Sequence, residues 1–517
     1  MKPRAPRYSP TPAAERAPPR RLALAAGAAA ADAALPVPID PAATQGLVIR
    51  GYDFRFTRYL ALTVKDPGKA RDFILGLVQG EQEWPRVTTA QQWVAPGPNH
   101  CLNLAFTWPG LKALEVPDAS LASFDQAFRT GAKGRAAFVG DVGPSAPEHW
   151  RLDDRGFHVM LILYGTSRDL LDDDVALLKP DLLEGFDDPG DANTFESQAL
   201  DDRYVYFGYK DGIAQPHIQG VDYVKDPDGG QLETDPSAFM LGTGISGNAY
   251  AGPPLPKPQP LGLHGCFGAF RLLLQDCEGY DAQVARLADD PKFVAYSKMS
   301  DPALRRDAVK ALMCGRWPNG TPLSIFPVQG DKKPPVLFEN ELNDFLYVLP
   351  KGEPDGNPAV NADPGSNCPM GSHIRRGNMR GSPFADTPAV YHRIMRRAAA
   401  YQIPYDGDDR NTGERGLMGF FMGSSFGDQF EFVQASWVNN RAGFDGMPDI
   451  ADPVMGTNPE DGTRFVETLG GGPRDAFTLQ GMESFVHTRA SAYCFFPGMD
   501  GLEWIGRAGW APPRPHE

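Results

Sequence analysis

An internal repeat constrains the fold of this chain more than any other feature of its sequence. The first copy, RYLALTVKDPGKARDFILGLV, occupies residues 58–78, and the second, GAFRLLLQDCEGYDAQVARL, occupies residues 268–287. In both copies a short apolar stretch typical of a strand leads to an aspartate, Asp66 or Asp276, and then to apolar residues at helical spacing. Because a lone strand and helix cannot bury their apolar faces, the repeat predicts two α+β units of similar build.

Further apolar patterns add strands and helices to both halves. The predicted strands include CLNLAFTW, FHVMLILYG, NDFLYVLP, FFMGSSF and SAYCFFPG, and the predicted helices include DPALRRDAVKALMCGRW and QFEFVQASWVNN. The run YHRIMRRAAAYQIPYDGD suits either a helix or an extended chain. We therefore expect an α+β fold class, with two ferredoxin-like units that have antiparallel sheets in a dimeric α+β barrel-like arrangement.

A proline-rich stretch, AGPPLPKPQPLGLHG, divides the chain, because prolines disfavour helices and central strands. We predict a disordered tail or weak signal segment at residues 1–45 and an N-terminal ferredoxin-like domain at 46–250. A linker at 251–265 and a C-terminal ferredoxin-like domain at 266–517 follow.

Composition limits the function classes. The 517 residues carry 50 Lys and Arg against 65 Asp and Glu, and a net charge of −15 gives no overall attraction to nucleic acid or anionic lipid. No stretch after the tail has the eighteen or so apolar residues that span a bilayer, so no membrane partner is expected. The six cysteines form no C-x-x-C pair and are interpreted as buried thiols.

The alanine-rich N-terminal tail favours a cytoplasmic protein, although it also resembles a weak export signal. Composition leaves open whether the chain forms a homo-oligomer.

The stretch NCPMGSHIRRGNMR places His373 just before Arg375, Arg376 and Arg380. The nine histidines form no H-x-x-x-H or H-E-x-x-H pair, which argues against a multi-histidine metal site. A single-histidine ligand is still allowed, since haem iron needs only one proximal imidazole, and arginines suit its propionates. The alternative is a surface loop with solvated arginines.

The stretch YFGYKDGIAQPHIQG contains a G-x-x-D-G turn formed by Gly208, Asp211 and Gly212. Such glycines let the backbone turn with positive φ or lie against a flat ligand, and Asp211 can then accept a proton. The simpler interpretation is a surface turn, because Asp-Gly is a strong turn signal.

Arginines recur at Arg393, Arg396 and Arg397. One guanidinium directed into an apolar cavity can stabilise negative charge that develops in a reaction. The alternative is that all three form surface ion pairs.

The order of these motifs resembles the dye-decolourising peroxidases, a haem peroxidase family. The order is G-x-x-D-G, then C-P-x-x-x-H-I-R-x-x-N-x-R, then R-R, then QFEFVQASWVNN. The resemblance extends to CLNLAFTWPGLKAL, GRWPNGTPL and FVHTRASAYCFFPG, and it covers most of the chain after about residue 50. It implies haem b in the C-terminal half, covered by a loop from the N-terminal half.

The resemblance also implies roles for single residues. His373 is the expected proximal iron ligand, and Asp211, between Gly208 and Gly212, is the expected distal acid. Arg396 is the expected distal arginine, with Arg397 as the alternative. Arg380 and Arg375 are expected near the propionates.

The reaction implied by the family is reduction of hydrogen peroxide through a ferryl intermediate, followed by oxidation of organic donors such as dyes and phenolics. Surface aromatic residues pass electrons in this family. The candidates here are Tyr391, Tyr401, Tyr405 and Trp437, although core packing is the more common role of an aromatic side chain.

Three departures from the family pattern stand out. Gly427 lies where a carboxylate partner of the proximal histidine is expected, so either Asp428 takes that role or the histidine is less polarised. Gly419 replaces a bulky residue above the haem, which either widens the pocket or leaves Phe420 to fill it. Met370 and Met379 replace Phe and Pro types beside the histidine and would be open to oxidation.

Two other functions fit parts of the sequence. A haem carrier or haem-release protein would use the same cradle with little turnover, but it would not need Asp211 and Arg396 together. An α+β binding protein without haem would leave all three motifs as turns.

Overall fold

The computed structural model describes most of the chain between residues 37 and 510. The described residues are 37–80, 84–200, 203–221, 234–245, 252–338, 341–347, 367–378, 380, 392–403, 413–439, 451–457, 463–468 and 476–510. They all belong to one compact unit, Pro36–Glu517. Tyr391, Tyr405, Met379 and the tail up to residue 36 lie outside the described residues.

The main sheet takes four strands from each half of the chain. The strands of the first half are β1 (Phe56–Leu62), β2 (His100–Phe106), β4 (Val159–Gly165) and β5 (Thr194–Gln198). Those of the second half are β6 (Cys266–Gln275), β7 (Met395–Ile403), β8 (Glu414–Gly423) and β11 (Val486–Phe496). The short β3 (Leu152–Asp153) pairs with β11, and β9 (Thr463–Thr468) pairs with β10 (Ala476–Met482) in a separate two-stranded sheet.

The strand order shows that the two halves are built alike. The sheet runs β5-β1-β4-β2-β11-β6-β8-β7, so each half has its fourth, first, third and second strand side by side. All pairs along this path are antiparallel, and β11 joins the halves by pairing with both β2 and β6. This is the ferredoxin-like order, and the predicted α+β fold class is confirmed. The outer strands β5 and β7 also contact each other, so the sheet curls round.

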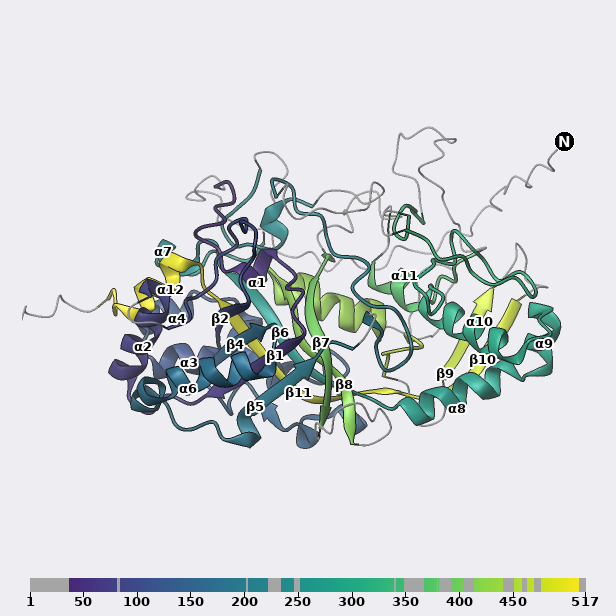
Figure 1. The fold of residues 1–517 in the computed structure, drawn as a ribbon, viewed down its shortest axis with the longest axis horizontal. Coiled ribbons are helices and arrows are strands. Elements are labelled where there is room, and N and C mark those ends of the chain that lie inside the picture. The colour runs from purple at the N-terminus through teal and green to yellow at the C-terminus, as the bar shows by residue number, and fades with distance from the viewer. Residues whose placement is uncertain are drawn as a thin grey trace, which may run out of the picture. The chain divides into compact units, whose positions relative to one another are not determined.

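Helices fill the connections between the strands (Figure 1). In the first half they are α1 (Gly46–Ile49), α2 (Pro67–Gln79), α3 (Trp108–Ala113), α4 (Asp118–Ala122), α5 (Gln126–Arg135) and α6 (Arg168–Gly185). The second half has α7 (Gln259–Gly262), α8 (Cys277–Ala288), α9 (Pro291–Ser297), α10 (Pro302–Cys314), α11 (His373–Gly377) and α12 (Met499–Gly506). Single 3₁₀ turns occur at Gly143–Ser145, Pro147–His149, Asp191–Asn193 and Pro236–Ala238, and π-helical turns at Phe426–Phe430 and Val433–Val438.

The aspartate of each repeat caps the helix that follows its strand. The carboxylate of Asp66 accepts a hydrogen bond from Lys69 N–H at the start of α2. Asp276 does the same for Gly279 N–H at the start of α8. Each cap satisfies one backbone donor that the helix cannot pair, so the repeated aspartate marks a helix start in both halves.

Both faces of the central strands are buried, and residue parity along each of them decides which core a side chain joins. In β1, Tyr59 and Ala61 join an inner core that the two halves share, whereas Leu60 and Leu62 join an outer core beneath helices. In β6, Phe270 belongs to the inner core. A third core includes side chains of α8, α9 and α10. These helices lie at the right of Figure 1, near β9 and β10. Burial on both faces explains why strands such as β4 and β6 have nearly continuous apolar sequences.

Two local predictions have clear outcomes. The arginine-rich run that suited either a helix or an extended chain forms β7. The predicted strand NDFLYVLP is wrong over its described part, because residues 343–347 form no strand: Asn343 ends a turn, and Leu346 makes only an isolated bridge. The side chain of Asn343 binds neighbouring loops there, which replaces the partners that a sheet would provide. The predicted domain boundaries stay a prediction, since strands of both halves share one sheet.

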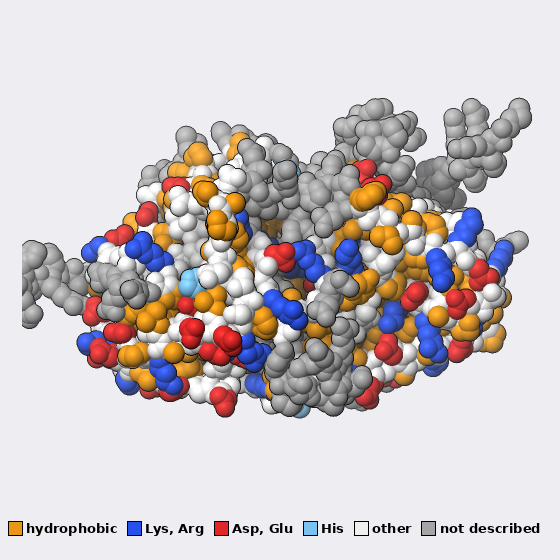
Figure 2. Space-filling view, viewed as in Figure 1, with side chains coloured by type: hydrophobic (Ala, Val, Ile, Leu, Met, Phe, Trp, Pro, Cys, Tyr) orange, Lys and Arg blue, Asp and Glu red, His pale blue; other side chains and the backbone are white. Residues whose placement is uncertain are grey.

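Acidic and basic side chains are interspersed on the face drawn in Figure 2, with apolar side chains in small groups between them. Within the described residues, no helix combines the length and the hydropathy that crossing a membrane requires.

A buried ion pair joins the two halves beneath the sheet. Arg271 on β6 donates two hydrogen bonds to the carboxylate of Asp141, at 2.5 and 2.6 Å. Thr488 on β11 donates to the same carboxylate at 2.8 Å. The side chains of Arg271 and Asp141 are 5% and 4% exposed, so the loss of one partner would leave the other charge buried.

We expect Asp141→Ala to lower the free energy of unfolding by about 3–5 kcal/mol, because Arg271 would keep a buried charge without its carboxylate. Urea unfolding followed by circular dichroism measures the change. Glu503→Ala, which removes an exposed pair with Arg507, is the control and should cost less than about 1 kcal/mol. Equal losses in the two variants would contradict the role of the buried pair.

Candidate active site

His373 is the first residue of α11, and its ring is held by a buried carboxylate. The ring Nδ1 lies 2.9 Å from Oδ2 of Asp452, whose side chain is fully buried. Seventy-nine residues separate the two in the sequence. The second carboxylate oxygen, Oδ1, accepts the backbone N–H groups of Val454 at 2.8 Å and Met455 at 3.0 Å. Asp452 is therefore fixed in place and orients the imidazole.

The electrostatics of this pair favour an ionised Asp452. Burial alone would raise the pKa of Asp452, but His373 and then Arg376 outweigh it and hold the pKa below its ordinary value of 3.8. Since the carboxylate stays charged at neutral and mildly acidic pH, it accepts the Nδ1–H of His373. In the neutral ring, the free lone pair then belongs to Nε2.

Nε2 of His373 is free for a ligand in the part of the chain that the structure describes. The only hydrogen bond of the ring to a described residue is the one to Asp452, and 29% of the side chain is exposed. A histidine whose Nδ1–H binds a carboxylate and whose Nε2 is open is the arrangement that proteins use for metal-ligating imidazoles. The donor set therefore fits a haem iron held by one histidine.

The carboxylate at His373 corrects the expectation for Asp428. The backbone N–H of Asp428 donates to Ser425 Oγ at 3.1 Å, and its carboxylate accepts from the same hydroxyl at 3.2 Å. This N-cap geometry fixes Asp428 at the start of the π-helical turn Phe426–Phe430. The histidine is nonetheless polarised, by Asp452. Nothing in local spacing marks Asp452, because it lies 79 positions after His373 in the sequence.

The arginines that follow His373 are buried. Arg376 donates to the carbonyls of Gly371 and Trp437, which ties α11 to the π-helical turn Val433–Val438. Arg375 donates to the carbonyl of Cys368 and lies over the ring of Tyr347. These contacts stabilise the segment that carries His373.

Arg380 binds the loop around Asn343. It donates to the carbonyl oxygen of Asn343 at 2.7 Å and to the side-chain oxygen of the same residue at 2.7 Å. The expected roles of Arg375 and Arg380 beside haem propionates stay predictions.

The G-x-x-D-G stretch forms a tight turn. Gly208 and Gly212 have φ angles of +81° and +72°, which residues with a side chain rarely adopt. The N–H of Asp211 donates to the carbonyl of Arg203 at 2.7 Å, and its side chain is exposed. The turn thus fixes the backbone of Asp211 and leaves its carboxylate accessible.

This turn is anchored on the helices of the other half. Phe207 stacks on Tyr280 of α8 with ring centroids 4.2 Å apart, and Lys310 of α10 donates to the carbonyl of Phe207. The hydroxyl of Tyr209 donates to the carbonyl of Lys310 at 2.8 Å. A loop of the first half is thereby held against the third core, in the half that carries His373.

The structure separates the two adjacent arginines of β7. The side chain of Arg396 is exposed, and it donates to the carbonyl of Ala214, three residues after Asp211. The N–H of Arg396 also donates to the side chain of Gln215 at 3.1 Å. Arg396 and the loop of Asp211 are therefore neighbours.

Arg397 is instead buried, and its guanidinium also donates to the side chain of Gln215 at 3.3 Å. It donates to the carbonyls of Leu47, Val48 and Ile49 in α1. Burial lowers the pKa of Arg397 to about 10, so the side chain stays charged at neutral pH. The hydrogen bonds of Arg397 stabilise the packing of α1 against β7. Of the two guanidinium groups, only that of Arg396 is exposed. Arg393 is also buried and donates to Thr234.

The other residues that depart from the family pattern have packing roles. A side chain at Gly419 would place its Cβ 2.1 Å from the carbonyl oxygen of Arg397, so close pairing of β7 and β8 requires glycine there. Phe420 packs in the shared inner core against Tyr59 and Phe270. Met370 is half-buried.

The described aromatic candidates for electron transfer are both buried. Tyr401 donates its hydroxyl to Glu414 at 3.0 Å. Trp437 packs edge-on against His392 and Phe432. Core packing accounts for both side chains as the structure places them.

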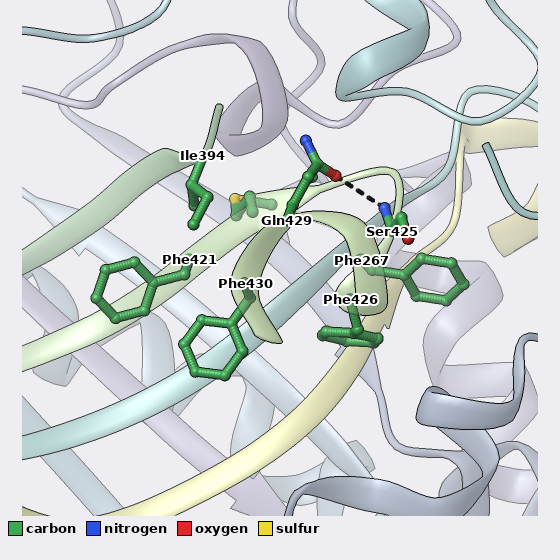
Figure 3. A pocket seen from close by; sticks show the side chains of 9 residues that line it. Phe267, Ile394, Phe421, Ser425, Phe426, Gln429 and Phe430 are labelled. Carbon is green, nitrogen blue, oxygen red and sulfur yellow. Dashed lines mark hydrogen bonds between the residues drawn. The ribbon is translucent and has the colours of Figure 1, made fainter. Parts of the chain in front are cut away.

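A small apolar pocket lies between β8 and the π-helical turn after it (Figure 3). None of the predicted site residues lines it, and it has no ionisable side chain. Its lining residues are Phe267, Ile394, Phe421, Met422, Gly423, Ser425, Phe426, Gln429 and Phe430. The site candidates are therefore two separate groups of contacts, His373 with Asp452 and Arg396 with the loop of Asp211.

Known proteins resemble the chain over most of its length, although no protein-family model matches it. A dye-decolorizing peroxidase of Mycena epipterygia is 27% identical over 468 residues, which cover 82% of this chain and 80% of the relative. The multifunctional dye peroxidase DyP2 of Amycolatopsis sp. is 30% identical over 275 residues, which cover 50% of this chain and 52% of the relative.

The fold gives the same result. The crystal structure of a fungal DyP-type peroxidase from Auricularia auricula-judae superimposes with a TM-score of 0.72 at 22% identity, covering 90% of this chain and 99% of that one. A dye-decolorizing peroxidase whose heme pocket was engineered for asymmetric sulfoxidation superimposes with a TM-score of 0.71 at 23% identity, covering 92% and 100%. In sequence the chain is similar to dye-decolorizing peroxidases over most of its length, and it shares the fold of DyP-type structures, which confirms the resemblance drawn from its motifs.

Proposed function

We propose that this chain is a haem-dependent peroxidase that reduces hydrogen peroxide and oxidises organic donors such as dyes and phenolics. The observation that carries the proposal is His373, with Nδ1 on the buried carboxylate of Asp452 and Nε2 open to a ligand. We assign Nε2 of His373 as the proximal ligand of haem b. The similarity to dye-decolorizing peroxidases over most of the chain supports this reading.

Asp452 has a defined part in this proposal. By accepting the Nδ1–H, it increases the electron density that His373 offers to a metal and fixes the orientation of the ring. Because its folded-state pKa is depressed, its contribution is fully present above the unfolded pKa of a carboxyl group and is lost as pH falls through the lower folded pKa. The support for His373 should therefore persist at mildly acidic pH.

Asp211 and Arg396 are the groups that we assign to the peroxide. When bound, haem supplies the redox-active iron at which hydrogen peroxide is reduced and donors are oxidised. The exposed carboxylate of Asp211 would take a proton from one peroxide oxygen and return it to the other. The guanidinium of Arg396, held beside Ala214, would stabilise the negative charge on the departing oxygen.

No observation on the described residues favours the haem-carrier alternative. A carrier has no use for an accessible acid and an accessible arginine held by one loop, as Asp211 and Arg396 are. The first experiment is the absorption spectrum of the purified protein before and after one equivalent of hydrogen peroxide at mildly acidic pH. A Soret band that changes with peroxide and recovers with a dye supports the peroxidase, whereas a Soret band indifferent to peroxide refutes it.

His373→Ala should reduce the haem content of the purified protein by about tenfold or more, because the ligand to the iron is lost while the protein fold remains. The ratio of Soret to protein absorbance measures the content. His392→Ala is the control, since that ring stacks on Phe432 and its Nδ1 contacts the carbonyl of Asp428. Full haem occupancy with an unaltered spectrum in His373→Ala would place the ligand elsewhere.

Asp211→Asn should slow the reaction with peroxide by about 10²–10⁴-fold, because an amide cannot carry the proton. Haem content should not change, since the side chain of Asp211 is exposed and its backbone bond to Arg203 is kept. Stopped-flow absorbance measures the rate. Asp289→Asn, which alters an exposed partner of Arg305, is the matched control. An unchanged peroxide rate in Asp211→Asn would exclude the acid role.

The two arginines of β7 should separate in their effects. Arg396→Leu should slow the peroxide reaction by about 10²–10³-fold with little loss of stability, because an exposed donor to the reacting oxygen is removed. Arg397→Leu should destabilise the fold by about 1–3 kcal/mol or more, since buried carbonyls of α1 lose their donor. Stopped-flow rates and urea unfolding of both variants measure this. The reverse pattern would make Arg397 the distal arginine.

A further inference from the structure

Asn343 is one of the most fully buried polar residues in the chain, with 0% of its surface exposed. Its side chain lies between three segments that are far apart in sequence. The amide nitrogen Nδ2 donates to the carbonyl of Ile213 at 2.6 Å. The amide oxygen Oδ1 accepts from Arg316 at 2.5 Å and from Arg380 at 2.7 Å. One amide therefore uses its donor on one loop and its acceptor on two arginines.

The orientation of this amide follows from the chemistry of its partners. A guanidinium can only donate hydrogen bonds, so the oxygen must face Arg316 and Arg380. A carbonyl can only accept, so the nitrogen must face Ile213. Only an amide of this length satisfies all three partners.

The donor side of Asn343 reaches the loop of Asp211. Ile213 is two residues beyond Asp211, and a Cβ on Gly320 would lie 2.6 Å from the side chain of Ile213. Lys210 N–H donates to the carbonyl of Pro318 at 2.9 Å, in the same turn as Gly320. The loop that carries Asp211 thus packs against the segment that follows α10. The hydrogen bond from Asn343 to Ile213 is a further contact that holds the loop in this position.

The acceptor side of Asn343 reaches the segment of His373. Arg380 is seven residues beyond His373, and it also donates to the backbone carbonyl of Asn343 at 2.7 Å. Its guanidinium lies 4.1 Å from the ring centroid of Phe345. The position of Arg380 is therefore fixed with respect to Asn343 by two hydrogen bonds and a ring contact.

We propose that Asn343 is a positioning residue that sets the place of the Asp211 loop relative to the segment of His373. The inference rests on the proposed function, in which these two segments carry the acid and the iron ligand. Asn343 contacts neither side chain, so it acts through Ile213 and Arg380. A displacement of an acid by about 1 Å can cost about 10²-fold in rate, which makes one buried amide consequential.

The test uses two substitutions at this position in the full chain. Asn343→Asp keeps an acceptor for Arg316 and Arg380, whose charges can pair with the new carboxylate, but it cannot donate to Ile213, so it breaks the link to the loop and keeps the link to the arginines. Asn343→Ala removes both links. The control is Asn103→Ala, because Asn103 is the other fully buried asparagine among the described residues and donates to Gln45 and Thr88 instead.

The first readout needs no haem. Hydrogen exchange of peptides that span residues 203–215 reports on the loop, whose Asp211 N–H is bonded to Arg203. We expect exchange about tenfold faster in both Asn343 variants and unchanged exchange in Asn103→Ala. Exchange equal to that of the unaltered chain in Asn343→Asp would overturn the proposal.

The second readout separates positioning from general stability. In the haem-loaded protein, we expect the rate constant with hydrogen peroxide to fall about 10- to 100-fold in Asn343→Asp. The resting absorption maximum and the KM for a dye should stay as in the unaltered chain. A loss matched by Asn103→Ala, or an equal loss in every parameter, would overturn the proposal. If the unaltered chain binds no haem, the proposed function fails, and hydrogen exchange alone decides the role of Asn343.

Discussion

The shared inner core of the two halves is the constraint on which the rest of the structure depends. Each half presents a four-stranded sheet with apolar side chains on both faces, so neither can be stable with one face in water. Pairing of β11 with β2 and contact of β5 with β7 bury the inner faces together. Burial of apolar surface on this scale is the main favourable term in folding. The halves therefore fold as one unit.

Buried ion pairs also connect the two halves. Apolar packing is not directional, so it does not by itself fix how the halves align. Glu431 is fully buried and accepts two hydrogen bonds from Arg135 of α5 and one from Tyr493 of β11. Together with the pair of Arg271 and Asp141, it places two specific ion pairs across the interface. Such pairs add little stability over an apolar core, but a shifted register would leave their charges unpaired.

Segments that carry candidate site residues are held by contacts with the opposite half of the chain. The loop of Asp211 leaves the first half and is held by Tyr280 and Lys310 of the second. The segment before and after Asp452 belongs to the second half and is held by the first. Asn439 donates to the carbonyl of Val139, and Thr457 donates to the carbonyl of Gly140. Each half thus holds in place a segment of the other half that carries a candidate site residue.

Local patterns predicted the elements well and the side-chain partners poorly. The repeat, the capping aspartates Asp66 and Asp276 and the two-unit α+β class all follow from spacing within a few residues. The strand predicted at Asn343 was wrong. The buried side chain of Asn343 binds loops that are distant in sequence, and the pattern of apolar residues cannot indicate such contacts. Asp428 was the predicted partner of His373 because only the order of motifs in the sequence was available. The fold instead brings Asp452, 79 positions away in the sequence, next to the imidazole.

The sequence by itself determined the class of fold, the repeated unit, the candidate histidine and the loop with Asp211. These depend on periodicity, glycine conformation and residue type, which are local properties. Only the tertiary structure decided that Asp452 supports His373, that Arg396 is accessible while Arg397 is buried, and that Asn343 joins the two segments. Such partnerships arise between residues tens or hundreds of positions apart, and they exist only once the two halves have buried their common core.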